Sequence, residues 1–192
     1  TIPNITIASP LNEIELRNMM YTAQLKGSGP FSIRYPRGRG VMPDWRMPFE
    51  KIEIGKGEQI RAGESMAVIS IGPVGNIAMA AAEKLQQDGI SVAVYNMRFL
   101  KPLDDKLLHH ILSKYDKIIT LEDGSVIGGL GSAVIEFKND HNYKSSVTRL
   151  GIPDRFVEQG APQELHRECG IDAEGIINSV KKVLKPVISG SL

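Results

Sequence analysis

The sequence predicts an α/β fold in which a three-layer, mostly parallel sheet carries helices on both faces. Beyond residue 65, short apolar runs alternate with segments of helical periodicity. Residues 66–71 form a continuous apolar run, which is typical of a strand covered on both sides. Strands that alternate with helices of roughly 10–15 residues indicate crossover connections, and these join parallel strands with a right-handed turn.

The first 38 residues predict a strand, a helix and a second strand. Residues 5–8 are a short β-type run, and Ser9 has the chemistry of a helix N-cap. Residues 31–35 return to strand composition, which Pro36 ends because proline cannot donate to a sheet. Three such short elements cannot bury their own faces, so we expect them to be the end of a larger domain that begins before Thr1.

Residues 39–51 have the composition of a linker, since they are aperiodic and interrupted by prolines. We expect Trp45 and Phe49 to hold this linker against a neighbouring surface. After it, glycines bracket residues 54–63 into two short runs that resemble a hairpin.

The α/β alternation then supplies the remaining elements. Strands are predicted at residues 66–71, 91–95, 117–121 and 147–150, and helices at residues 73–88, 103–112, 129–140, 162–169 and 173–184. We therefore expect three parts: residues 1–51 as the tail of one domain plus a linker, residues 52–185 as a second domain, and residues 186–192 as a frayed tail.

Composition excludes several classes of function. The formal net charge is +1, so no overall field draws the chain to nucleic acid or to an anionic membrane. Cys169 is the single cysteine, which rules out an internal disulfide and fits a small buried residue. No apolar run approaches the roughly 20 residues of a membrane span, and no signal-peptide layout is present. We expect a cytoplasmic protein.

Arginines gather at one place, around the Tyr-Pro step of Arg34-Tyr-Pro-Arg-Gly-Arg-Gly40. They could form a phosphate grip, a nucleic-acid patch or a charged loop, and the near-zero net charge disfavours the second. Arg98 lies just past a predicted strand, where α/β sheets place ligands, but it could equally join two domains. The loop Gly128-Gly-Leu-Gly131 opens a helix, yet it lacks a nucleotide-binding pattern, and close approach to a neighbouring domain is favoured.

Six segments, in this order, resemble the C-terminal part of the 1-deoxy-D-xylulose-5-phosphate synthase family, within the transketolase-like thiamine diphosphate enzymes. They are Ala8-Ser-Pro-Leu-Asn-Glu, Arg34-Tyr-Pro-Arg-Gly38, Ile54-Gly-Lys-Gly-Glu58, Met97-Arg-Phe-Leu-Lys-Pro-Leu-Asp104, Glu122-Asp-Gly with Gly128-Gly-Leu-Gly-Ser132, and Leu150-Gly-Ile-Pro-Asp-Arg-Phe-Val-Glu-Gln-Gly160. The resemblance covers residues 1 to 184. At position 124 this chain has Gly where many members have Asn.

The resemblance implies that residues 1–51 are the tail of a pyrimidine-binding domain plus the linker, and that residues 52–185 are a transketolase-type C-terminal domain. The family condenses pyruvate with D-glyceraldehyde 3-phosphate, releases CO2, and feeds isoprenoid, thiamine and pyridoxal biosynthesis. It works as a homodimer with thiamine diphosphate and Mg²⁺. The segments that hold cofactor, metal and catalytic residues are absent from this chain, so we expect no such residues here and no activity of the fragment alone.

Within this resemblance, Arg37 is the residue that binds the phosphate of glyceraldehyde 3-phosphate, whereas Arg34 is structural. Arginine suits the task because its planar guanidinium meets phosphate oxygens with two hydrogen bonds and stays charged. The alternatives that stay open are a C-terminal part of a 2-oxo-acid dehydrogenase β subunit or of a transketolase, or a free-standing α/β interaction module.

Overall fold

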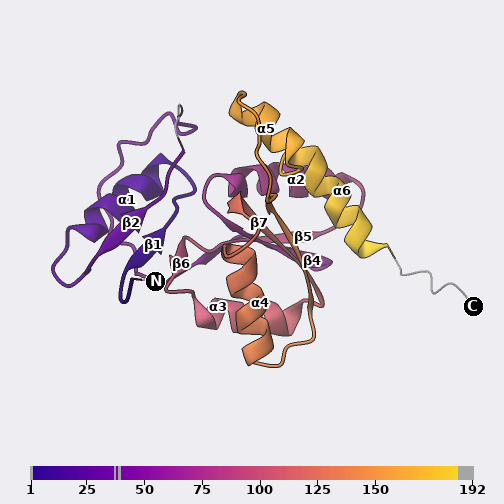
Figure 1. The fold of residues 1–192 in the computed structure, drawn as a ribbon, viewed down its shortest axis with the longest axis horizontal. Helices are drawn as coiled ribbons and strands as arrows, with labels where there is room; N and C mark the ends of the chain where they lie inside the picture. The colour runs from indigo at the N-terminus through magenta and orange to yellow at the C-terminus, as the bar shows by residue number, and fades with distance from the viewer. Residues whose placement is uncertain (1, 37, 39, 186–192) are drawn as a thin grey trace, which may run out of the picture.

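The computed structural model describes residues 2–36, 38 and 40–185. Its centre is a five-stranded sheet with the strand order β3-β5-β4-β7-β8 (Figure 1). The strands are β3 Glu58–Arg61, β4 Met66–Ile71, β5 Val92–Asn96, β7 Lys117–Ser125 and β8 Ser146–Ile152. All neighbouring pairs are parallel except β3, which runs antiparallel to β5 at one edge. The predicted mostly parallel sheet is confirmed.

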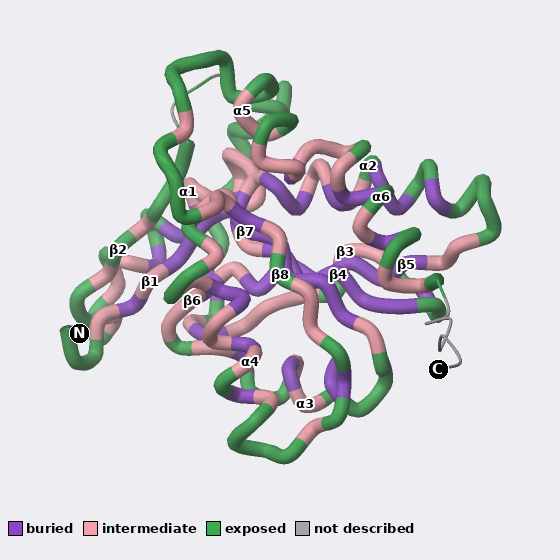
Figure 2. The backbone as a smooth tube through the Cα atoms, turned by 45° about the vertical axis from the view of Figure 1, so that its right-hand side comes forward, coloured by how far each residue is buried: buried purple, intermediate pink, exposed green. Residues whose placement is uncertain are grey.

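Helices cover both faces of this sheet, as predicted (Figure 1). The pair α2 Val74–Gln87 and α6 Ala173–Leu184 packs on one face, and the pair α3 Asp105–Lys114 and α4 Leu130–Asp140 packs on the other. The short α5 Pro162–Glu168 precedes α6. In Figure 2 the strands between the two helix layers are the most continuously buried part of the chain.

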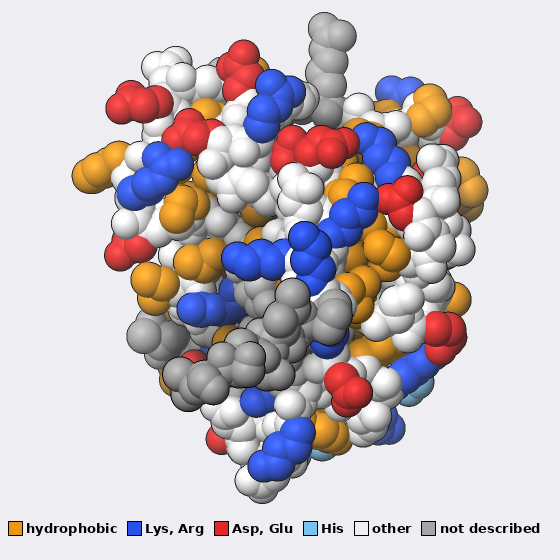
Figure 3. Space-filling model, turned by 90° about the vertical axis from the view of Figure 1, so that its right-hand side faces the viewer, with side chains coloured by type: hydrophobic (Ala, Val, Ile, Leu, Met, Phe, Trp, Pro, Cys, Tyr) orange, Lys and Arg blue, Asp and Glu red, His pale blue; other side chains and the backbone are white. Residues whose placement is uncertain are grey.

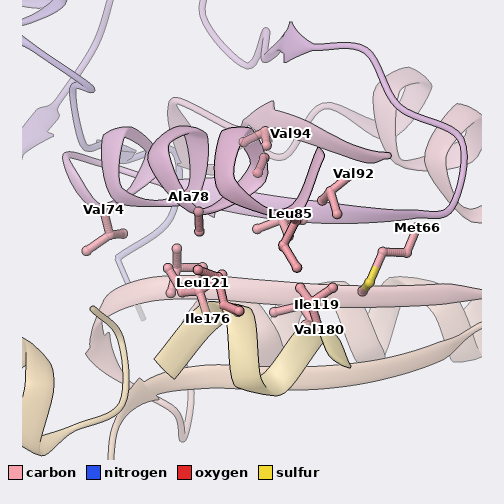
Figure 4. Close-up of a cluster of buried hydrophobic side chains, with 14 of the residues drawn as sticks. Met66, Val74, Ala78, Leu85, Val92, Val94, Ile119, Leu121, Ile176 and Val180 are labelled. Atoms are coloured by element: carbon pink, nitrogen blue, oxygen red, sulfur yellow. The ribbon is translucent and has the colours of Figure 1, made fainter. Parts of the chain in front are cut away.

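Alternating side chains of the central strands feed two separate cores. On β7, Ile119 joins the cluster under α2 and α6, where it lies with Leu85 and Val180 (Figure 4). Its neighbour Ile118 joins Leu108 in the cluster under α3 and α4. Because successive side chains of a strand point to opposite faces, a continuous apolar run is what a doubly covered strand requires.

The N-terminal unit consists of β1 Thr6–Ala8, α1 Glu13–Ala23 and β2 Phe31–Ile33, and it takes a further strand from the rest of the chain. β1 pairs parallel with β2 and antiparallel with β6 Phe99–Lys101, which gives the order β2-β1-β6 (Figure 1). The small core here includes Ala8 and Met19 of the N-terminal unit together with Phe99 of β6. The two units are therefore joined by a shared sheet.

Between β2 and β3, none of the described residues belongs to a helix or a strand, in agreement with the predicted linker. The expected aromatic contacts are present. Phe49 stacks on Tyr21 of α1 with 5.4 Å between ring centroids, and the Arg17 guanidinium lies 4.2 Å from the Phe49 centroid and 5.5 Å from that of Trp45. The linker thus lies against α1.

Two local predictions are wrong. The N-cap of α1 is Asn12, whose side chain accepts a hydrogen bond from the Glu15 amide at 3.0 Å, while Ser9 bonds elsewhere. Residues 54–63 form no hairpin, because only β3 is extended and its partner is β5. The predicted frayed tail, residues 186–192, lies outside the described residues, and the division at residue 51 stays a prediction.

Surface charges are mixed in sign. On the face shown in Figure 3, several Lys and Arg side chains lie near one another across the middle, and acidic and apolar side chains lie around them. Exposed ion pairs such as Lys181–Asp88, at 2.7 Å, join α6 to α2, and each such pair contributes about 0–1 kcal/mol. No helix in the part of the chain that the structure describes combines the length and apolar character needed to cross a bilayer.

Candidate functional site

Arg37, the residue assigned to substrate, lies outside the described residues, as does Arg39. The structure does describe the chain that leads into this loop. The amide of Arg34 donates to the Ala8 carbonyl at 2.8 Å, and the Ser9 hydroxyl donates to the Arg34 carbonyl at 2.9 Å. Both hydrogen bonds hold the start of the arginine loop, which we define as residues 34–42, against the end of β1.

The other end of the arginine loop is held by a carboxylate. The amides of Val41 and Met42 donate to the two carboxylate oxygens of Glu13, at 2.5 and 3.1 Å. A Cβ atom added to Gly40 would overlap this carboxylate, so the contact depends on a glycine at that position. The loop is therefore tied at one end to β1 and at the other to the first turn of α1.

Further along the linker, α1 continues to hold the main chain. Four of its side chains bond linker backbone groups, and we call Glu13, Arg17, Asn18 and Thr22 the α1 clamp. Besides the contacts of Glu13, Arg17 Nη1 donates to the carbonyls of Trp45 at 3.0 Å and Met47 at 2.5 Å. The Glu50 amide donates to Asn18 Oδ1 at 3.0 Å, and the Ile52 amide donates to Thr22 Oγ1 at 2.9 Å. The contacts advance along helix and linker together, so the linker follows α1 from its first turn to its last.

Arg98 joins the two units. Its Nε donates to Glu15 Oε1 on α1 at 2.7 Å, and its Nη2 lies 2.7 Å from Glu58 Oε1 on β3. Its backbone is left-handed, with φ 57, and its amide donates to the Asn96 side chain at 3.2 Å. Of the two interpretations that the sequence left open for Arg98, the geometry supports the inter-unit contact.

Glu15 is the centre of this contact because its carboxylate is buried, with 7% of the residue exposed. A buried charge is tolerated only when hydrogen bonds or an opposite charge replace water. The Glu15 carboxylate accepts hydrogen bonds from the Leu11 amide at 2.7 Å, from the Asn96 side chain at 3.0 Å and from the Arg98 guanidinium. Two of these three donors come from the larger unit, so docking of the units satisfies the carboxylate.

Glu58 has a different electrostatic balance. Burial raises the pKa of the Glu58 carboxyl above its ordinary value; the Arg98 guanidinium acts in the opposite direction with less effect, and the neighbouring Glu15 charge raises the pKa further. Protonation of Glu58 therefore reduces the repulsion between two carboxylates that share one guanidinium.

A cavity of about 490 Å³ opens where α1, the linker and Arg98 meet. Its size is that of small-molecule sites, which are typically about 300–1,000 Å³, but such sites are mostly apolar. The lining here is largely polar and charged, and it includes Asn12, Glu15, Asn18, Glu53, Lys56 and Arg98. The cavity belongs to the junction between the units.

The glycine loop before α4 has a partner from its own unit. The Glu122 carboxylate on β7 accepts hydrogen bonds from the amides of Leu130 and Gly131, both at 2.9 Å. It thus occupies the helix N-terminus where a nucleotide phosphate would bind. A Cβ atom at Gly129 would overlap the Glu122 carboxylate. The close approach predicted for this loop is therefore confirmed, but it is made to a residue of the same unit and not to a neighbouring domain.

Asp123 makes a second contact between the units. It lies 3.8 Å from the exposed Arg34 guanidinium and 3.9 Å from the His166 ring. This contact fits a structural role for Arg34, which stays a prediction. Among residues 2–36, 38 and 40–185, no group of three His, Cys, Asp or Glu side chains is placed to hold a metal ion.

Other potentially reactive side chains lie in structural surroundings. His109 is partly buried between α3 and α4, and its Nδ1 lies 2.8 Å from the Tyr143 hydroxyl, whereas His110 is exposed. Burial raises the pKa of the Cys169 thiol, which keeps it protonated and less nucleophilic. The Cys169 side chain is half-buried, so the sequence expectation of a fully buried cysteine is met only in part.

The fold is that of a three-layer α/β domain. Its mostly parallel sheet has the order β3-β5-β4-β7-β8 with helices on both faces, and its β6 pairs with β1 of the N-terminal unit. The family model described as "Transketolase, C-terminal domain" matches residues 55–176. The chain therefore belongs to the family of transketolase C-terminal domains.

Relatives make the comparison more particular. The chain is 54% identical over 183 residues to 1-deoxy-D-xylulose-5-phosphate synthase of Cytophaga hutchinsonii, covering 95% of this chain and 29% of that protein. The protein of the same name from Bacteroides fragilis is 52% identical over 182 residues, covering 94% and 28%. The chain thus spans less than a third of the length of these curated relatives.

A solved structure extends the likeness to the whole described fold. A split-gene transketolase, described as an inactive β4 tetramer, superposes with a TM-score of 0.84 at 32% identity. The match covers 96% of this chain and 59% of that one. The N-terminal unit is therefore included in the shared architecture.

The Glu15 network makes a prediction for stability. Replacing Glu15 with Ala leaves the partly buried Arg98 guanidinium with Glu58 as its carboxylate partner, and it should lower the free energy of unfolding by about 1–3 kcal/mol. Urea denaturation measures this. The matched comparison is Glu15→Met combined with Arg98→Met, which should cost less than the two single Met variants summed, by about 0.5–3 kcal/mol. Strictly additive effects would contradict the network, and Glu83→Ala on α2 serves as a surface control.

Glu58 makes a prediction for pH dependence. Its pKa is raised on folding, so its contribution to stability is fully present at low pH and is lost as pH rises through the pKa of the folded state. The unfolding free energy of Glu58→Gln minus that of the parent chain should therefore increase from pH 4 to pH 7. Urea titrations at several pH values measure the difference, and a constant or decreasing value would show that the Glu58 carboxylate is not disfavoured by folding.

Proposed function

We propose that this chain is the C-terminal part of a 1-deoxy-D-xylulose-5-phosphate synthase, which condenses pyruvate with D-glyceraldehyde 3-phosphate and releases CO2. The observation that carries the proposal is the 54% identity to a protein of that name over 95% of the chain, a span that includes both units. Relatives from the Bacteroides and Geobacillus lineages bear the same name. This shared name favours the synthase over a 2-oxo-acid dehydrogenase subunit or a free-standing module.

In the full-length enzyme, thiamine diphosphate would supply a nucleophilic carbon for the reaction with pyruvate, with Mg²⁺ as its companion ion. By the family resemblance, both would be held by other segments of the longer protein. What this chain contributes is the acceptor side: it binds and orients the phosphorylated aldehyde and supports the cleft from the larger unit. A homodimer in the cytoplasm completes the proposal.

Arg37 is the proposed phosphate-binding residue. A guanidinium meets phosphate oxygens with two hydrogen bonds and stays charged, which suits it to bind the phosphorylated end of the acceptor. The proposal is supported by the family resemblance of residues 34–38, and the described residues Arg34 and Val41 on either side are bonded by Ser9 and Glu13.

A direct test compares this chain with the full-length protein, extended upstream in its own reading frame. With pyruvate, D-glyceraldehyde 3-phosphate, thiamine diphosphate and Mg²⁺, the full-length protein should form 1-deoxy-D-xylulose 5-phosphate and release CO2, while this chain alone should form none. Turnover by the chain alone would refute the proposal that it is an inactive part. A full-length protein that makes no product from these substrates would refute the assigned reaction.

Arg37→Ala in the full-length protein tests the phosphate contact. Loss of a charged contact costs about 1.5–3 kcal/mol, so KM for glyceraldehyde 3-phosphate should rise about 10- to 150-fold. KM for pyruvate should change little, because pyruvate carries no phosphate. Steady-state kinetics with each substrate varied in turn measures both constants. Equal increases for the two substrates would show that Arg37 acts on the site as a whole rather than on the phosphate.

A further inference from the structure

Exposed apolar side chains are concentrated on α1 and the second half of the linker. We define the apolar strip as Tyr21 of α1 together with Trp45, Met47 and Phe49 of the linker. The exposed fraction of these residues ranges from 36% for Tyr21 to 57% for Phe49. Single exposed apolar residues are ordinary, but a contiguous group of them marks a surface that contacts another protein segment.

The apolar strip is contiguous because Arg17 lies at its centre. The Arg17 guanidinium is 4.2 Å from the ring centroid of Phe49, which stacks on Tyr21, and 5.5 Å from that of Trp45. It also donates to the carbonyls of Trp45 and Met47. These contacts use the guanidinium within the strip, so the surface that remains open is one of ring faces and a thioether. Its complement is an apolar protein surface rather than a polyanion.

The linker side chains of the strip are not turned inward by the fold. Every residue from 41 to 51 is exposed, and the linker is held to α1 by hydrogen bonds of the α1 clamp instead of by buried apolar groups. Burial of apolar side chains is the usual means by which an irregular segment is held on a protein surface. The apolar side chains of this segment are therefore available to a further partner.

The N-terminal unit is open on the side that carries α1. In the described part of the chain, β2 pairs with β1 alone, so its other edge has no strand beside it. In Figure 1, α1 and β2 lie on the side of the molecule away from the five-stranded sheet. The larger unit therefore leaves this side of the N-terminal unit uncovered.

We propose that the apolar strip is the surface on which the polypeptide upstream of Thr1 docks in the full-length protein; this inference rests on the proposed function. The chain spans 29% of the length of its Cytophaga hutchinsonii relative, so more than two thirds of such a protein lies outside it. A second copy of this chain fits less well. A two-fold contact would bring the strip against itself, and with it the guanidinium groups of Arg17 and Arg46, both of which lie on the Trp45 ring.

Oxidation of Met47 by hydrogen peroxide, followed by mass spectrometry, tests the docking because the rate of sulfoxide formation depends on exposure of the sulfur. Met47 is 51% exposed in this chain, whereas Met66 is 0% exposed and reports whether the core is folded. In the native full-length protein, Met47 should oxidise at least about tenfold more slowly than in this chain alone, with Met66 slow in both. Should Met66 oxidise rapidly in this chain, the full-length protein unfolded in urea replaces it as the reference.

Equal rates of Met47 oxidation in the two proteins would overturn the proposal. Protection of Met47 in this chain alone that increases with protein concentration would assign the strip to a second copy, and would overturn it as well. Formation of 1-deoxy-D-xylulose 5-phosphate is measured on the same full-length sample. An active protein with unprotected Met47 refutes the docking alone, and an inactive protein with protected Met47 refutes the assigned reaction alone.

A charged substitution gives an independent readout. Met47→Lys should lower Tm of the full-length protein by about 3 °C or more, because the ammonium group would be buried in the docked surface. Gln86→Lys, at an exposed position of α2, is the matched control and should change Tm by less than about 1 °C. In this chain alone both variants should behave like that control, since both side chains already face water. Equal shifts for the two variants in the full-length protein would contradict docking at the strip.

Discussion

The buried carboxylate of Glu15 is the interaction on which the arrangement of this chain depends. It lies on the first turn of α1, and the side chains that bond it from the larger unit are Asn96, the last residue of β5, and Arg98, two residues further on. Removing either side chain while the units stay docked would leave a buried charge with fewer partners, at a cost of several kcal/mol. The β1–β6 pairing and the Asp123–Arg34 contact also join the two units. Together these contacts fix the position of α1 relative to the five-stranded sheet.

Because α1 is fixed, it can serve as a template for the segment that has no regular structure of its own. The linker between β2 and β3 contains no helix or strand among its described residues. Its amides and carbonyls nevertheless form hydrogen bonds with the side chains of the α1 clamp, in the same order along the linker as along the helix. Side chains thus replace the backbone partners that a helix or sheet would supply. Glu13 begins this series of contacts by bonding the amides of Val41 and Met42, at the end of the arginine loop.

The sequence predicted what depends on local pattern. Continuous apolar runs and helical spacing identified the central strands and helices, because burial on two faces leaves a signature within each segment. It missed β6, since the pairing of Phe99 with Ala8 depends on residues far apart in the chain, and it gave the N-cap to Ser9 although the helix begins after Asn12. No sequence motif assigned a role to the carboxylates of Glu13, Glu15 and Glu122, because each finds its hydrogen-bond donors only after folding. Arg37 came from family resemblance and stays a prediction.

Hydrogen–deuterium exchange of the linker amides tests most directly whether α1 holds this segment in one path. The amides of Val41, Met42, Glu50 and Ile52 donate to side chains of the α1 clamp, and protection of a loop amide requires such a bond to persist. We expect these four amides to exchange at least about tenfold more slowly than an unstructured chain of the same sequence. Exchange of all four at the rate of an unstructured chain would contradict a linker held by α1.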